Sequence, residues 1–283
     1  MGSKAFAMSG DELAYPARLK IWRAKKHIQE LWLDVEKFMQ DRPFRVVVKH
    51  RPQAGEYLIV TKRYKTIPDY WSLIIGDIVH NLWSSLDLAI YSMASDKATD
   101  PHALTFPFVR EEKWLEGKIK STQVDFAGTN VVRYIRALKP YRDGNPVLSG
   151  IFRLDTRDKH RLLILTGQVL DFNKATLRAI IPGSPPINWP DSIGKIRFPH
   201  PDEDEVQLFK GFIDYSSAEW ARFKSSADHE EEPYIRLPYF IAFGEGQPFE
   251  GSPVIPTLKD CVYVIEGIID QMFLNFRSPA NIR

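Results

Sequence analysis

The sequence has very little cysteine, with Cys261 alone in 283 residues. A single cysteine excludes a disulfide within the chain and is typical of a protein that folds in a reducing compartment. There is also no Walker loop, no glycine-rich dinucleotide turn, no paired-cysteine zinc motif and no nucleophile elbow. The first twenty residues lack the apolar core of a signal peptide. We therefore expect a cytoplasmic protein that needs no cofactor.

Residues 70–95 contain no Lys, Arg or Glu, although a helix with one face in water normally carries several. The apolar spacing from about Pro68 to Ser95 predicts a long helix that is buried on most sides. Its polar residues recur at steps of three and four, so they form one stripe: Asp77, His80, Ser84, Asp87 and Tyr91. The ionisable groups of this stripe argue against a membrane span, and we expect no membrane contact.

The stretch LDTRDKHRLLIL, residues 154–165, mixes two acids, four basic side chains including a histidine, and an apolar block. We predict that it belongs to a helix running from about Pro146 to Leu170. A helical projection puts Asp155 and Asp158 on the apolar face, whereas His160 lies nearer the outer side with Arg153. A buried carboxylate is costly without a hydrogen bond or a countercharge. We therefore expect these two acids to meet the polar stripe around His80.

The remaining patterns predict an α+β fold. Residues 12–40 have the spacing of a surface helix, RVVVKH and EYLIVTKRY flank a turn and predict a hairpin, and two short helices are expected at EEKWLEGKIK and NVVRYIRALKPY. After Phe172, the runs ATLRAII, GKIRF, VQLFKGFI and YIRLPYFIAF predict an antiparallel sheet, and the last apolar stretch predicts a closing helix. We expect a helical bundle with an N-terminal β-hairpin over 1–173, and a C-terminal antiparallel sheet plus a closing C-terminal helix packed on it over 174–283. A single compact domain is the alternative.

The net charge of +2 is distributed unevenly along the chain. Residues 1–173 hold 27 basic and 20 acidic side chains, whereas residues 174–283 hold 11 and 16. An excess of this kind is compatible with RNA or another anionic ligand at the basic N-terminal part, although an uneven solvated surface is the simpler explanation. The sequence leaves open whether two copies of the chain pair as a homodimer.

Three explanations fit the acids around His80. The first is a structural network that locks two helices in register. The second is a metal-free acid–base site, in which His80 or His160 carries the proton and Lys159 or Arg161 stabilises an anion. The third is a metal site, because Asp77 and His80, and likewise Asp155 and Asp158, are each one helical turn apart.

The two polar helices resemble a family of uncharacterised bacterial proteins. Its members carry a pattern close to G-D-x-x-H-N-L-R-x-x-L-D-H, then F-P, then Q-P-Y, then L-D-x-x-D-K-H-R-L-L. The matching residues here are Gly76, Asp77, His80, Asn81, Leu82, Leu86, Asp87, Phe106, Pro107, Pro140, Tyr141, Leu154, Asp155, Asp158, Lys159, His160 and Arg161. Trp83 stands where the pattern has Arg, and Leu88 where it has the second His. The family brings no established activity.

A more distant resemblance is to HEPN-type helical ribonucleases, whose signature is an Arg and a His separated by four to six residues. Arg153 and His160 have that spacing. The resemblance implies metal-independent RNA cleavage of the defence or toxin type. The candidate catalytic residues are then His160, His80, Lys159, Arg161, Arg153 and Asp158. A non-catalytic module that binds a small ligand or a protein is the alternative, and a metal-dependent hydrolase using Asp77, His80, Asp155 and Asp158 is the further one.

Overall fold

The computed structural model describes residues 10–158, 163, 165–173, 192–197, 205–212, 228–232 and 239–276. Its helices are α1 (Gly10–Gln40), α2 (Tyr70–Ala94), α3 (Leu115–Ser121), α4 (Thr129–Ala137), α5 (Pro146–Asp158) and α7 (Val254–Phe276). Its strands are β1 (Phe44–Arg51), β2 (Glu56–Arg63), β3 (Leu165–Asn173), β4 (Ser192–Arg197), β5 (Glu205–Phe212), β6 (His229–Glu231) and β7 (Tyr239–Phe243). The predicted α+β class is confirmed.

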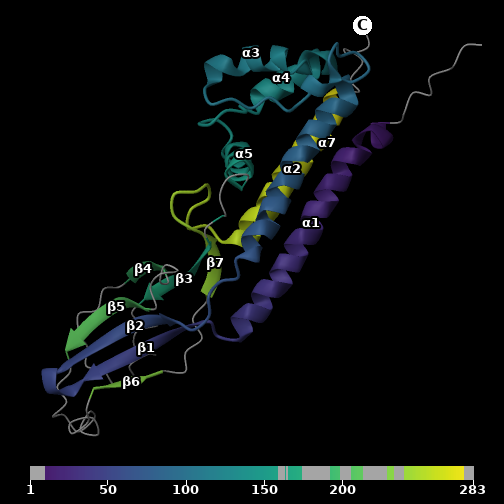
Figure 1. Cartoon of the computed structure of the whole chain (residues 1–283). Coiled ribbons are helices and arrows are strands. Elements are labelled where there is room, and N and C mark those ends of the chain that lie inside the picture. The colour runs from purple at the N-terminus through teal and green to yellow at the C-terminus, as the bar shows by residue number, and fades with distance from the viewer. Residues whose placement is uncertain are drawn as a thin grey trace, which may run out of the picture.

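The molecule is elongated, with the helices at one end and the sheets at the other (Figure 1). The long helices α1, α2 and α7 run side by side, and α3 and α4 lie across the end of the bundle where the chain terminates (Figure 1). The hairpin of β1 and β2 pairs from Phe44 with Arg63 to Arg51 with Glu56, as the sequence predicts. All strand pairings between the named strands are antiparallel.

The C-terminal strands do not form one sheet of their own. β5 and β6 join the hairpin in the order β5-β2-β1-β6, while β4, β3 and β7 form a separate three-stranded sheet. The run ATLRAII lies outside the described residues. The predicted sheet is therefore divided, because one of its strands, VQLFKGFI (β5), pairs with β2 more than a hundred residues earlier in the chain. Strand β6, which pairs with β1, was not among the predicted strands.

The predicted helix from Pro146 to Leu170 is too long. Helix α5 ends at Asp158 in the described chain, and Leu165 already begins β3, which pairs with β7. The block LLIL has the length and composition of a buried strand as well as of a buried helix, so periodicity alone does not separate the two.

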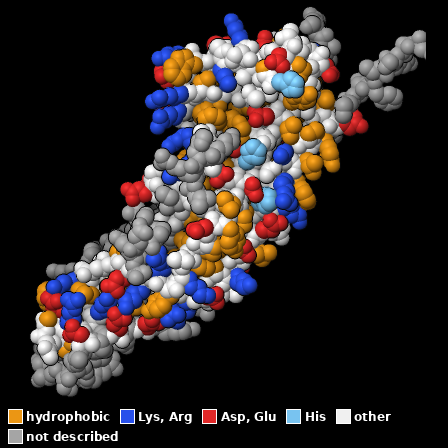
Figure 2. All heavy atoms as spheres, in the orientation of Figure 1, with side chains coloured by type: hydrophobic (Ala, Val, Ile, Leu, Met, Phe, Trp, Pro, Cys, Tyr) orange, Lys and Arg blue, Asp and Glu red, His pale blue; other side chains and the backbone are white. Residues whose placement is uncertain are grey.

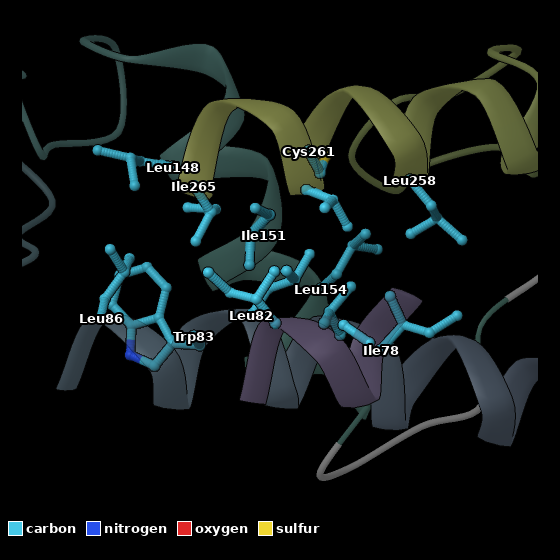
Figure 3. Packing of buried hydrophobic residues seen from close by; sticks show 14 of the residues in the cluster. Ile78, Leu82, Trp83, Leu86, Leu148, Ile151, Leu154, Leu258, Cys261 and Ile265 are labelled. Atoms are coloured by element: carbon cyan, nitrogen blue, oxygen red, sulfur yellow. The ribbon is translucent and has the colours of Figure 1, made fainter. Parts of the chain in front are cut away.

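One continuous apolar cluster runs through the helices and reaches β1 and β2. Figure 3 shows its centre, where side chains from α2, α5 and α7 interdigitate. Those labelled there are Ile78, Leu82, Trp83, Leu86, Leu148, Ile151, Leu154, Leu258, Cys261 and Ile265. Cys261 is a core side chain, and burial raises the pKa of its thiol to about 12. This packing fixes α5 against α2 and so positions the polar residues described below.

Helix α2 is long and apolar enough, by length and composition, to cross a membrane. In the structure 56% of its most apolar window is buried inside the molecule. The core helix of a soluble protein meets the same measure, so this property does not place the chain in a membrane.

Candidate functional site: a histidine held by a buried carboxylate

The two polar helices meet at His80. Its Nδ1 lies 3.0 Å from Asp155 Oδ1, which confirms the predicted approach of the acids of α5 to the stripe of α2. The Asp155 side chain is only 5% exposed, whereas the His80 side chain is 57% exposed. The Asp155 carboxylate is thus buried at the edge of the core, whereas the His80 imidazole reaches the surface.

The contacts fix the tautomer of the ring. A carboxylate can only accept a hydrogen bond, so Nδ1 of His80 carries the proton and donates it to Asp155. The Nε2 lone pair is then free to accept, and Ser84 Oγ lies 3.3 Å from it. Ser84 is one turn along the same helix. When the ring is neutral, the result is an exposed imidazole whose Nε2 is oriented to accept a proton, the arrangement that a general base requires.

A second carboxylate, Asp158, lies close to the same helix. A Cβ atom added at Gly76 would overlap the Asp158 carboxylate, so α5 ends directly over the backbone of α2 at this glycine. Burial raises the pKa of Asp158 above its usual range, and the negative charges of Asp155 and Asp77 raise it further. The positive charge that His80 carries when its ring is protonated opposes that rise.

The described acids and histidine do not form a metal site. No group of three or more His, Cys, Asp or Glu side chains in the described part of the chain is arranged to hold a metal ion. The metal alternative, with Asp77, His80, Asp155 and Asp158 as ligands, therefore gains no support from these residues. Asn81 does not contribute either, because its amide donates to the Asp77 carbonyl of its own helix.

Other polar side chains of α2 tie the helix to different segments. Asp87 Oδ1 accepts from the backbone N–H of Phe106 at 2.7 Å. At the start of the helix, the buried hydroxyl of Ser72 donates to the Leu163 carbonyl at 2.7 Å. Asp87 thus helps to hold the fold together, whereas Asp77, His80 and Tyr91 of the stripe are exposed at the surface.

Basic side chains near the site are only partly described. Arg153 is exposed on α5, and Arg157 lies half-buried with Nη1 3.5 Å from the Gly246 carbonyl. Lys159, His160 and Arg161, which the resemblance to ribonucleases puts at the catalytic centre, lie outside the described residues. Their predicted roles stay predictions.

Trp83 explains one departure from the family pattern. Its ring is 5.8 Å from that of Phe106, 5.9 Å from Phe108 and 5.0 Å from Phe152, all edge-on. The position that holds Arg in the pattern is thus a buried aromatic anchor here, and no cation acts from it.

The uneven charge along the chain has an internal explanation. Acids of the C-terminal part pair with bases of the N-terminal part, both on the sheet and between α1 and α7. The pairs are Lys49 with Glu205 and Glu230, Lys62 with Glu205 and Glu230, Arg45 with Glu232, Arg18 with Asp270, and Lys25 with Glu266. The asymmetry therefore does not by itself require an anionic ligand.

Comparison with known proteins finds no matching family model, no matching curated protein and no matching solved structure. The inferences about function thus depend on the residues and geometry of this chain.

Proposed function

We propose that the chain is a metal-independent hydrolase whose general base is His80. The observation that carries the proposal is the hydrogen bond between Nδ1 of the exposed ring and the buried Asp155. Asp155 holds the ring with Nε2 outward and can stabilise the positive charge that develops when Nε2 takes a proton from water or a substrate hydroxyl. Asp158, whose carboxyl has a raised pKa, is the neighbouring group suited to return a proton to the leaving group.

RNA is the substrate class that we propose to test first. Cleavage at a 2′-hydroxyl needs one base, one acid and a cation near the phosphate, and no metal. Arg153 is an exposed cation on the outer side of the helix that carries Asp155, so RNA would have to cross this helix to meet both groups. The resemblance to HEPN-type ribonucleases supports the same choice, with His80 in place of His160 as the proton carrier.

The test compares His80→Asn, Asp155→Asn and the unaltered chain on single-stranded RNA and on a panel of simple phosphodiesters and esters, with EDTA present. The amide of the introduced asparagine can still donate to Asp155, so His80→Asn removes the proton carrier and keeps the helix contact. We expect a loss of at least about a hundredfold in rate for both variants. His102→Asn, at an exposed histidine outside the site, is the matched control and should keep full activity.

A structural lock is the second candidate function of the same residues. The contacts of Ser72, Asp87 and Asp155 each join α2 to another segment, which favours this role. In that case the unaltered chain hydrolyses nothing in the panel, and Asp155→Ala, which removes the contact between the helices, lowers the melting temperature. The absence of hydrolysis would contradict the hydrolase proposal.

A further inference from the structure

His80 has a hydroxyl neighbour on its own helix as well as a carboxylate neighbour on α5. Ser84 follows His80 by one turn of α2, so the two side chains lie on the same side of the helix. Ser84 Oγ is 3.3 Å from His80 Nε2, and His80 Nδ1 is 3.0 Å from Asp155 Oδ1. The three side chains therefore connect a hydroxyl, through an imidazole, to a buried carboxylate.

This order of groups is the one that activates a serine. A serine hydroxyl is a weak nucleophile unless a base within hydrogen-bond reach takes its proton, and the base needs a third group that orients it. Because Asp155 holds the proton of the neutral ring on Nδ1, Nε2 of His80 can accept the proton of Ser84. The distance of 3.3 Å between Ser84 Oγ and His80 Nε2 is typical of such a pair before a substrate binds.

The Ser84 hydroxyl is also accessible to a substrate. Ser84 is half-buried and the ring beside it is exposed, whereas the next serine, Ser85, is fully buried and donates to the Leu82 carbonyl of its own helix at 2.6 Å. Figure 2 shows that histidine and acidic side chains lie open on the surface of the helical part of the molecule. Of these two serines, only Ser84 thus combines a neighbouring base with access from solvent.

We propose that Ser84 is a catalytic nucleophile and that the reaction passes through a covalent intermediate on its Oγ. The inference rests on the proposed function, because it needs His80 as the general base. It also favours one substrate class. RNA supplies its own nucleophile, the 2′-hydroxyl, whereas a carboxylic ester does not, so a protein hydroxyl placed on the base is suited to the ester.

The reaction has two steps. In the first, Ser84 Oγ bonds to the carbonyl carbon while His80 Nε2 takes the hydroxyl proton. The bond from that carbon to the leaving oxygen breaks, and this oxygen takes a proton from the Asp158 carboxyl and departs as an alcohol. In the second step, a water oxygen bonds to the same carbon and gives a proton to the Asp158 carboxylate. The bond to Ser84 Oγ then breaks, Nε2 returns its proton to that oxygen, and a carboxylic acid is released.

Phenylmethylsulfonyl fluoride tests for the nucleophile directly. Ser84 Oγ bonds to the sulfur, fluoride leaves, and the hydroxyl proton passes to His80 Nε2 and then to water. We expect mass spectrometry of the digested protein to find the label on Ser84, and labelling there to be about a hundredfold slower in His80→Asn.

Two serine variants complete the labelling experiment. Ser84→Ala should lose the label at this position. Ser121→Ala is the matched control, since Ser121 is exposed but its hydroxyl donates to the Lys118 carbonyl of its own helix. The control variant should be labelled on Ser84 as fast as the unaltered chain.

Turnover of p-nitrophenyl acetate separates this inference from the proposed function. We expect Ser84→Ala to lower the rate at least about a hundredfold. Its melting temperature should not fall, because alanine is a good helix former. A Ser84→Ala variant that keeps the ester rate, beside a His80→Asn variant that loses it, would overturn the nucleophile and leave the proposed function standing, since His80 then acts on water.

The two remaining outcomes are equally informative. Labelling of Ser84 that depends on His80, in a chain that hydrolyses nothing in the panel, would support the nucleophile and contradict the proposed hydrolase. A chain that neither takes up the label on Ser84 nor hydrolyses the ester would overturn the nucleophile as well.

Discussion

Gly76 is the residue on which the approach of the two polar helices depends. Glycine inside a helix is unfavourable, and here it leaves room for the Asp158 carboxylate against the backbone of α2. We expect Gly76→Ala to destabilise the protein by about 1–3 kcal/mol, because the new methyl group forces the end of α5 away. Chemical denaturation measures the change in the free energy of unfolding.

The control for this substitution is Gly117→Ala in α3, where an added Cβ meets nothing within 4 Å. That variant should be more stable by roughly 0.5–1 kcal/mol, through helix propensity alone. In the double variant Gly76→Ala/Asp158→Ala the clash is removed, so its destabilisation should be much smaller than the sum of the two single effects. Additive effects would show that the two residues are not in contact.

Asp158 makes stability depend on pH. Its pKa in the folded protein is raised from the ordinary 3.8, mainly by burial and then by Asp155 and Asp77. The folded state therefore holds this proton more tightly than the unfolded state, and stability falls as the pH rises from 3.8 through the folded pKa. Asp158→Asn should melt at a higher temperature than the unaltered chain at neutral pH, and the difference should vanish below 3.8, where both states are protonated. A difference that is the same at every pH would contradict this account.

At the scale of elements, the long helices were predictable because each repeats its apolar residues at helical spacing over many turns. The contact of Asp155 with His80 was predictable because a carboxylate on the apolar face of a helix needs a hydrogen-bond partner. The sequence indicates the close approach of Asp158 to Gly76 only weakly, through a glycine within a helical pattern. Nothing in the sequence indicates that Ser72 donates to the backbone carbonyl of Leu163, because this contact is between residues far apart in the chain.

The strands were harder to assign than the helices. The sequence from Leu162 to Leu165 fits a helix or a strand, and the partner of Leu165 in β7, Phe243, comes more than seventy residues later in the chain. Glu230 and Glu232 pair with Lys62 and Arg45, which lie far away in the sequence. Local sequence carries no information about such distant partners, so the division into two sheets could not be derived from it.

At the scale of the whole molecule, the apolar core and the ion pairs both join residues from the two sides of the predicted domain boundary at residue 173. Helix α7 buries its apolar face in the same cluster as α1, α2 and α5, and β5 and β6 complete the sheet begun by the hairpin. Residues 1–173 alone would expose that face of the bundle and both edges of the hairpin to water. We therefore expect this fragment to lack a cooperative thermal transition when it is expressed by itself.

Supplying residues 174–283 as a separate chain should restore the transition, because the missing helix and strands need no covalent link to reach their places. Calorimetry of the fragment, of the mixed fragments and of the full chain measures the effect directly. A fragment 1–173 that melts cooperatively near the temperature of the full chain would show that the bundle is an independent domain. In that case the ion pairs between residues 1–173 and 174–283 would join two independently folded domains. The apolar cluster that they share would then contribute little to folding.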